Sequence, residues 1–437
     1  MSGGVVPPSL GEQKYNICAV TIPYASCSVT SGGSPGGGKI WQLFGVLVFP
    51  AAVAVHAMLP VLALGSIAFG IRADIQLSVA DIGLAFSSFF LCSAVFTSAG
   101  GWLAVRSRTS TVARAGTLCS SLLFVGLGAA PNRPVFLMLC LGAGVVNGLL
   151  TPSLNILITK IVPVNRWGLA FGLKAAAAPA AATFAALGAY CVAELGVDWR
   201  SLFWSCAVAG GLLFTLSWRL GRDEVETDRR EQRQRMRPQR SLVILGFGGL
   251  CGSIGTSVLT PFTVEGLIDA GQTPSSAAIL LAVGGWVGIV SRVAVGVLSD
   301  VWPEPLCHLR ATSAMLVAGS LSMVVLGAGG PFGLLLSATL VAFGLGWSWP
   351  GLLHHAALAT HAHNAAVATS YMQTGTFLGA LIGPLCFGFV AQQVSFPAAW
   401  FISATSALLG AAFMMATVRE LKPHHPPNDS PPLTLTV

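Results

Sequence analysis

The most regular feature of the sequence is a succession of long apolar segments separated by short polar ones. Each segment holds about 20 to 28 residues, and at 1.5 Å per residue a helix of that length crosses the hydrocarbon core of a bilayer. The pattern predicts twelve membrane-spanning helices, at residues 42–70, 80–104, 111–130, 134–160, 168–193, 200–220, 241–268, 275–299, 308–328, 331–357, 365–392 and 396–418.

A run of charge from Arg219 to Arg240 divides the predicted helices into two groups of six. It contains eight arginines and five acidic residues. Such a run is typical of a nucleic-acid-binding patch, a solvated helix or an inside-facing membrane loop. Because it lies between two sets of spans, on the side that carries the other basic loops, we interpret it as a cytoplasmic linker and exclude nucleic acid as a partner.

The charges of the connecting loops predict the orientation of the chain. Besides the central run, the loops on one side of the membrane carry Arg106, Arg108, Arg114, Lys160, Arg166 and Arg310. The loops on the other side carry only Arg72, Arg133 and Arg200. Since cytoplasmic loops are enriched in Lys and Arg, the first side and both termini are expected in the cytoplasm.

The composition agrees with a membrane protein. Of the 437 residues, 54% are hydrophobic and 9% are charged, whereas a soluble domain has about 25% charged residues. The ten cysteines are scattered without a CxxC pair and are interpreted as small buried residues. Arginine outnumbers lysine 18 to 5, and Ala and Gly are abundant. These features indicate a bacterial inner-membrane protein.

Five regions follow from these patterns. Residues 1–40 are rich in Gly, Ser and Pro and are expected to be a disordered tail rather than a signal peptide. Residues 41–220 form a first six-helix bundle, 221–240 the linker and 241–420 a second bundle. Residues 421–437 form a Pro-rich disordered tail.

The two halves repeat each other. Pro152 and Pro350 lie 198 residues apart, as do Ala170 and Ala368. The sequences GWLAV at 101–105 and GVLSD at 296–300 are offset by 195 residues. A near-constant offset across three helix pairs indicates duplication, which is the layout of a two-bundle transporter.

Several motifs resemble those of the major facilitator superfamily. The resemblance covers residues 41–420 and rests on GVLSD at 296–300 with Arg292 before it, PVNRWGLAFG at 163–172, DWR at 198–200 and TGTFLGALIGPLCFG at 374–388. It implies an all-α membrane fold, in which two pseudo-symmetric six-helix bundles surround a midplane site and move by alternating access.

The resemblance also implies a gating motif, formed by Gly296 and Asp300 in the second half and by Gly101 in the first. The first half departs from the family pattern, because Val105 stands where the family has Asp. We therefore expect the latch to rest on Asp300 alone.

Two cations within the spans are the first candidates for chemistry, since ionisable groups are costly in a bilayer. Lys174 lies about 9 Å from the cytoplasmic end of its helix, and Arg292 about 12 Å from its own. The resemblance makes their helices neighbours, so that both would flank one cavity. Alternatively, Lys174 snorkels to the headgroups, and Arg292 pairs with Asp300 or caps carbonyls at its own helix end.

No Asp or Glu occupies the middle of a predicted span, and Glu265 lies about 36 Å along its helix, at the outer edge. A substrate anion would therefore supply the missing counter-charge. The guanidinium fork matches a carboxylate or a phosphate, and we expect an organic anion, in the first place a small carboxylate. Arg292 also resembles the corresponding arginine of monocarboxylate and oxalate/formate carriers.

Four further residues are candidates for substrate binding. Asn147 and Asn155 lie eight residues apart on one helix face and either reach the cavity or bond neighbouring helices. Gln373 corresponds to Lys174 within one residue in the repeat, and Trp286 lies near mid-depth. His56 lies near the midplane and is a candidate for proton coupling, with a hydrogen-bonded core histidine as the alternative.

Other chemistry finds little support in the sequence. The spacing of His354, His355, His361 and His363 fits no standard zinc pattern, so no metal and no other cofactor is expected. No phosphate-binding Gly-rich loop precedes a Lys-Ser/Thr pair, which excludes ATP as the energy source. No nucleophile and base pair indicates an enzyme.

The sequence therefore predicts a monomeric secondary transporter in contact with membrane lipids, which moves a small organic anion, with His56 as the candidate for proton coupling. One alternative is a multidrug or metabolite exporter, which the missing carboxylate disfavours. Another is a transport-inactive sensor or scaffold, which Val105 favours.

Overall fold

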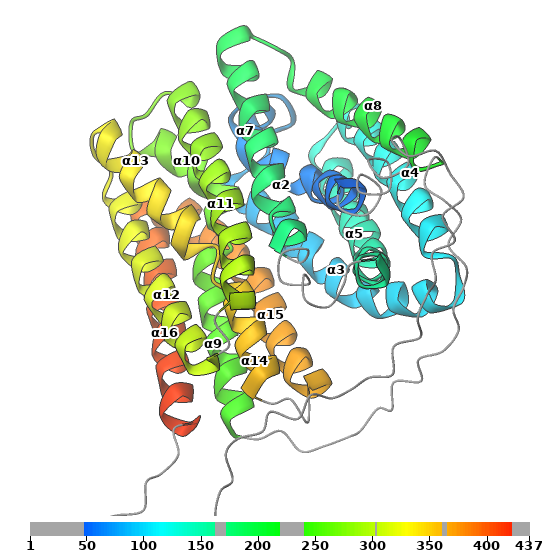
Figure 1. Cartoon of the computed structure of the whole chain (residues 1–437). Helices are drawn as coiled ribbons and strands as arrows, with labels where there is room; N and C mark the ends of the chain where they lie inside the picture. Colours follow the sequence, from blue (N-terminus) through cyan, green and yellow to red (C-terminus); the bar gives the residue numbers. More distant parts are fainter. Residues whose placement is uncertain (1–47, 162–171, 219–239, 302–303, 361–364, 422–437) are drawn as a thin grey trace, which may run out of the picture. The chain divides into compact units, whose positions relative to one another are not determined.

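The computed structural model describes residues 48–161, 172–218, 240–301, 304–360 and 365–421 (Figure 1). The predicted tails and most of the linker, the junction at 163–171, and His361 and His363 lie outside these residues. All the described elements are helices, and 12 of the described segments are long and apolar enough to cross a membrane. The predicted all-α membrane fold is therefore confirmed.

The first six spans run from blue to green in Figure 1. Their helices are α2 (Phe49–Ile75), α3 (Val79–Arg106), α4 (Thr109–Gly128), α5 (Arg133–Ile161), α7 (Ala177–Leu195) and α8 (Trp199–Ser217). A helical turn at 172–175 precedes α7, so the fifth span covers Gly172–Leu195.

The last six spans run from green to red in the same figure. Their helices are α9 (Arg240–Thr256), α10 (Leu259–Asp269), α11 (Pro274–Val301), α12 (Pro305–Ala328), α13 (Phe332–Val341), α14 (Pro350–Thr360), α15 (Ala365–Gln393) and α16 (Phe396–Leu421). Span seven consists of α9 and α10. Span ten consists of α13, a π-helical segment at Ala342–Gly346, and α14.

The predicted span ends agree with the helices to within a few residues, except in the first span. We expected that span to end at residue 70 and placed Arg72 in a loop, but α2 continues to Ile75. Its last turn stays helical because the charges have partners elsewhere: Arg72 pairs with Glu265, and Asp74 with Arg200. Gln76 then ends the helix in a left-handed conformation with φ 55°.

Two spans of the second half are broken at prolines. A proline has no N–H to donate to the carbonyl four residues earlier, and its ring crowds that carbonyl. Accordingly, α10 begins just before Pro261, and α14 begins at Pro350. Irregular backbone is tolerated at membrane depth only where its N–H and C=O groups bond to other parts of the protein or line a water-filled cavity. These breaks therefore mark candidate functional regions.

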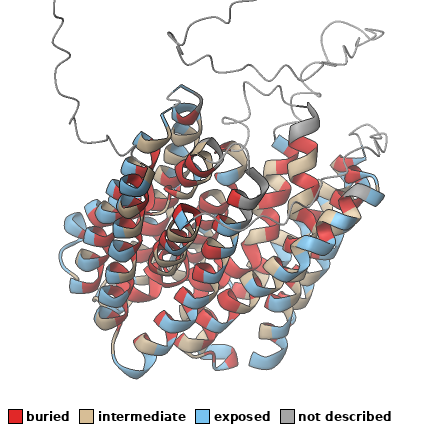
Figure 2. Ribbon diagram, turned by 90° about the horizontal axis from the view of Figure 1, so that it is seen from below, coloured by how far each residue is buried: buried red, intermediate tan, exposed pale blue. Residues whose placement is uncertain are grey.

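The buried side chains divide into one shared core and two separate ones. We call the end at which α2 finishes and α3 begins the α2–α3 end, and the opposite end the α3–α4 end. At the α2–α3 end, side chains of both bundles form one cluster that includes Leu64, Phe86, Phe203, Phe262 and Trp400. Figure 2 shows buried residues in red along the helices.

At the α3–α4 end each bundle has its own core. One cluster, which includes Phe49, Ala113 and Leu154, belongs to the first six spans. Another, which includes Leu245, Leu316 and Met414, belongs to the last six. The described side chains therefore join the two bundles in one core at one end and form two cores at the other.

Candidate functional site

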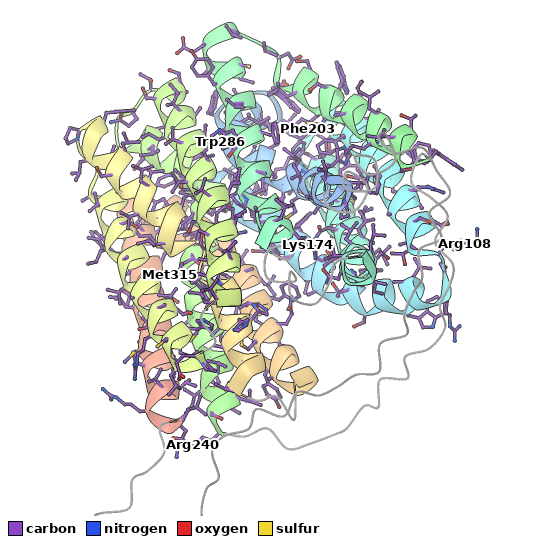
Figure 3. All side chains as sticks on the ribbon, in the orientation of Figure 1. Arg108, Lys174, Phe203, Arg240, Trp286 and Met315 are labelled. Atoms are coloured by element: carbon purple, nitrogen blue, oxygen red, sulfur yellow. The ribbon has the colours of Figure 1, made fainter. Side chains whose placement is uncertain are left out.

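Lys174 lies in the helical turn that precedes α7, where Figure 3 labels it. Its ammonium group donates to the Oδ1 atom of Asn155 on α5. Both side chains are half-buried. The structure thus brings together two residues that the sequence analysis had selected for separate reasons, and it gives the lysine a neutral partner.

The residue after Lys174 is held by the other bundle. Ala175 would normally accept a hydrogen bond from residue 179, but Pro179 has no N–H, so the helix leaves the Ala175 carbonyl without its usual donor. Arg292 of α11 takes that place, because its Nη1 atom donates to the Ala175 carbonyl oxygen over 2.6 Å. Arg292 therefore contacts the backbone next to Lys174.

Arg292 also contacts the backbone and a side chain at the break in span ten. Its Nη2 atom donates to the Trp347 carbonyl over 2.9 Å, and its guanidinium lies 4.3 Å from the centre of the Trp347 ring. The neighbouring Ser291 hydroxyl donates to the Gly344 carbonyl within the π-helical segment. Two polar residues of α11 thus satisfy backbone groups at the irregular part of span ten.

These contacts bear on the structural alternatives for Arg292. Besides substrate contact, the sequence left open a pair with Asp300 or capping of carbonyls at its own helix end. The structure shows capping, but the carbonyls belong to spans five and ten, in two different bundles. Asp300 lies in α11, and its side chain is outside the described residues.

Among the described residues, no carboxylate pairs with Lys174 or Arg292. Three ion pairs occur among the described residues: Arg72–Glu265, Arg133–Asp81 and Arg200–Asp74. All three lie at the α2–α3 end and none involves Lys174 or Arg292. Within the described part of the chain, the hydrogen-bond partners of these two cations are an amide and two backbone carbonyls.

The remaining candidates lie apart from this pair or bond to other helices. Asn147 donates from Nδ2 to the Ser93 hydroxyl on α3 over 3.1 Å, which is helix-to-helix bonding within one bundle. The Oε1 atom of Gln373 lies 3.3 Å from the Nε2 atom of His354. Trp286 is 61% exposed on α11 (Figure 3). Their roles in binding substrate stay predictions.

His56 lies inside the first bundle, 3% exposed. Its Nε2 atom is 3.1 Å from the Cys206 carbonyl on α8, and its ring centre is 4.8 Å from that of Phe124 on α4. Gly210 makes room for it, since a Cβ atom there would meet the His56 ring. Its contacts are therefore those of the hydrogen-bonded core histidine, while proton coupling stays a prediction.

The two copies of the gating motif differ in their surroundings. The Cα atom of Gly296 lies 3.3 Å from the Cβ position of Gly172, so α11 and span five approach closely there. A Cβ atom at Gly101 would meet nothing within 4 Å. The glycine of the first half thus faces open space at the α3–α4 end, where the bundles have separate cores.

Several contacts were missed by the sequence analysis. The ion pair between Arg72 and Glu265 crosses from α2 to α10 over 2.6 Å, and no local pattern links residues 193 positions apart. His308 and His355 lie with their Nδ1 atoms 3.2 Å apart, joining α12 to α14. Pro179 could have indicated the contact of Arg292 with Ala175, because a proline within a predicted span leaves a carbonyl without its helical donor.

No described group of three or more His, Cys, Asp or Glu residues could hold a metal ion.

Comparison with known proteins gives a consistent result. The profile of the Major Facilitator Superfamily matches residues 43–331 and 245–435. The chain is 26% identical over 390 residues to the multidrug resistance protein MdtG of Dickeya zeae (strain Ech586), which covers 85% of this chain and 92% of that protein.

Solved structures show the same fold at low identity. A bacterial homologue of the human lysosomal transporter Spinster, in an inward-facing and occupied conformation, superposes with a TM-score of 0.64 at 15% identity, covering 89% of this chain and 97% of that one. A mutant of the nucleoside transporter NupG gives a TM-score of 0.64 at 13% identity, covering 84% and 99%. The twelve spans, the repeat and these matches together show that the chain belongs to the Major Facilitator Superfamily of membrane transporters.

Proposed function

We propose that this transporter carries a small organic anion, a carboxylate, and that Lys174 binds its charged group. The observation that supports this is the partner of Lys174: the amide of Asn155 orients the ammonium without neutralising it. An ammonium group has three N–H donors, so it keeps donors for a ligand. A carboxylate at this position would supply the counter-charge that the described contacts lack.

Arg292 supports the same proposal from the opposite bundle. A guanidinium has five N–H donors, and the described hydrogen bonds of Arg292 use one on Nη1 and one on Nη2. An anion held by Lys174 would lie close to the backbone that Arg292 contacts. Binding of the anion would thus be sensed at the contact between spans five, eight and ten.

The arrangement of the cores supports alternating access. In this structure the bundles share a core at the α2–α3 end and have separate cores at the α3–α4 end. A rocking motion would exchange these arrangements about the site between them. We place the α3–α4 end in the cytoplasm, and labelling of Cys307 in intact cells by a membrane-impermeant maleimide would contradict this orientation.

Transport by Lys174 variants tests the anion proposal. Purified protein in proteoliposomes is assayed with a panel of labelled mono- and dicarboxylates. Loss of a charge-assisted hydrogen bond costs about 1.5–3 kcal/mol, which corresponds to a rise of about 10- to 100-fold in KM. Lys174→Gln is expected to show this loss, and Asn155→Leu a smaller one.

The control is Arg310→Gln, which removes one positive charge from an exposed position on α12. It is expected to transport as the parent protein does. Uptake by Lys174→Gln equal to that of the parent would refute the anion site. Repeating the assay with and without a pH gradient tests the proton: coupling at His56 requires that the gradient drive uptake and that His56→Gln abolish this dependence.

A second candidate function is multidrug export, and the observation that favours it is the similarity to MdtG along most of both chains. That relative is named a multidrug resistance protein. If this chain shares the function, cells that express it should export lipophilic dyes, and Lys174→Gln should leave their export unchanged. The absence of any transported compound would instead favour the sensor or scaffold.

A further inference from the structure

We propose that the acyl chain of a membrane lipid occupies an apolar groove on the first bundle, between α2, α7 and α8. The groove has a volume of about 550 Å³. It is separate from the pair of Lys174 and Arg292, neither of which lines it. The proposal goes beyond the transported substrate, because it assigns a second kind of ligand to a second place.

The groove is long and follows the helices. Its wall on α2 runs from Ala52 to Ile67, and its wall on α8 from Leu202 to Leu216. At 1.5 Å per residue these stretches are about 22 Å and 21 Å long. One leaflet of hydrocarbon is about 15 Å thick, so the groove exceeds one leaflet along the direction of the spans. An extended acyl chain has this shape, whereas a compact solute does not.

The groove opens towards the bilayer. Phe184 on α7 and Leu212 on α8 line it and are 59% and 65% exposed. Both residues belong to candidate membrane spans, and we infer that the surface that they expose faces lipid. A lipid chain can therefore enter sideways from the membrane.

The polar groups of the wall have partners within the protein. The Ser205 hydroxyl donates to the Leu202 carbonyl over 2.7 Å, and Nε2 of His56 lies 3.1 Å from the Cys206 carbonyl. Most of the other lining residues are aliphatic or aromatic. Water would find few hydrogen bonds in such a space, since a buried water normally makes about three. A hydrocarbon chain fills it without leaving a polar group unmatched.

The test uses a phospholipid with a photoactivatable diazirine on its acyl chain. The full-length protein is reconstituted with this lipid, irradiated, digested and analysed by mass spectrometry. Labelling is expected to be concentrated on the walls of the groove at residues 52–67, 184–188 and 202–216. Equal labelling of all the lipid-facing helices would overturn the proposal, because it is the result for non-specific contact with the bilayer.

Two matched variants sharpen the experiment. Ala209 lines the groove and is exposed, so Ala209→Trp fills the groove from its mouth. Val208 is its neighbour, 65% exposed, and does not line the groove. Ala209→Trp is expected to lower groove labelling at least fivefold, and Val208→Trp to leave it unchanged.

Equal labelling in the two variants would refute the assignment. Ser205→Trp, one turn before Ala209 on the same helix face, provides a second filling variant if Ala209→Trp does not fold. An unlabelled phospholipid added in excess should compete for the groove.

Discussion

At the scale of single residues, Lys174 and Arg292 differ in the contacts that they make within the protein. Arg292 makes two hydrogen bonds to carbonyls and lies over the Trp347 ring, so it has a structural role in this state. Lys174 has an amide as its described partner. We therefore propose that the lysine binds the substrate and that the arginine connects the bundles.

This division predicts different effects on stability. Arg292→Ala removes the donors of two carbonyls. Water can replace the donor at the exposed Ala175, whereas the part-buried Trp347 carbonyl is left unsatisfied, which costs about 1–3 kcal/mol for a buried group. We expect this variant to melt several degrees below the parent protein in detergent. Arg292→Lys should recover only part of the loss, because an ammonium cannot span both carbonyls and also stack on Trp347.

The comparison is Lys174→Ala, which breaks one hydrogen bond to a half-buried amide and should melt close to the parent. Melting curves followed by intrinsic fluorescence separate the two cases. An unchanged melting temperature for Arg292→Ala would assign that arginine to the substrate alone.

The sequence identified candidate residues but not their interaction partners. The cost of burying a charge identified Lys174 and Arg292 as functional candidates, and both lie at the contact between spans five and eight. Their partners were not predictable, because Asn155, Ala175 and Trp347 are brought to them by three different helices. For Asn147 and His56, the observed contacts are those of the structural alternatives considered from the sequence.

At the scale of elements, the helices could be located closely because prolines and charges bound each apolar run. The breaks within spans seven and ten were not predicted, because hydrophobicity continues through Pro261 and Pro350. The end of α2 was misplaced for the opposite reason, since Arg72 and Asp74 resemble a loop until their distant partners are known.

Close contact between elements gives a prediction at Gly65 of α2. A Cβ atom there would lie 2.6 Å from the Cα atom of Pro261 on α10, closer than backbone atoms tolerate. Gly65→Ala should therefore push α2 and α10 apart and lower the melting temperature.

Gly211→Ala on α8 is the matched control, because its added methyl group meets nothing within 4 Å. Alanine favours a helix over glycine by about 1 kcal/mol, so this variant should melt at the same temperature or higher. Destabilisation by Gly211→Ala as large as that by Gly65→Ala would mean that the contact with Pro261 does not set the effect.

At the scale of the whole molecule, the described residues join the two bundles at the α2–α3 end by apolar packing and by one ion pair. Arg72 of the first bundle lies 2.6 Å from Glu265 of the second, whose side chain is 6% exposed. The repeat in the sequence predicted two bundles, but it carried no information on which end is closed, because alternating states share one sequence.

The ion pair provides a test of that closure. Glu265→Arg or Arg72→Glu places like charges together and leaves a buried charge unpaired, which costs about 3–5 kcal/mol. Each single variant should favour the state open at the α2–α3 end and reduce transport.

The exchanged pair, Arg72→Glu with Glu265→Arg, should restore much of the activity, because the attraction between the two positions returns. Transport assays of the three variants in parallel measure this. Failure of the double variant to exceed both single variants would show that the pair does not act as a connection.

The carbonyl of Ala175 also links the evolution of two distant residues, Pro179 and Arg292. This carbonyl oxygen has no donor within its own helix, because Pro179 lacks an N–H group. It accepts instead from Arg292, which lies in the other half of the chain. Replacing the proline would let the helix compete for the acceptor, and replacing the arginine would leave it unmatched. Residues 179 and 292 are therefore expected to have been inherited as a pair, although they lie in different halves of the chain and belong to different helices.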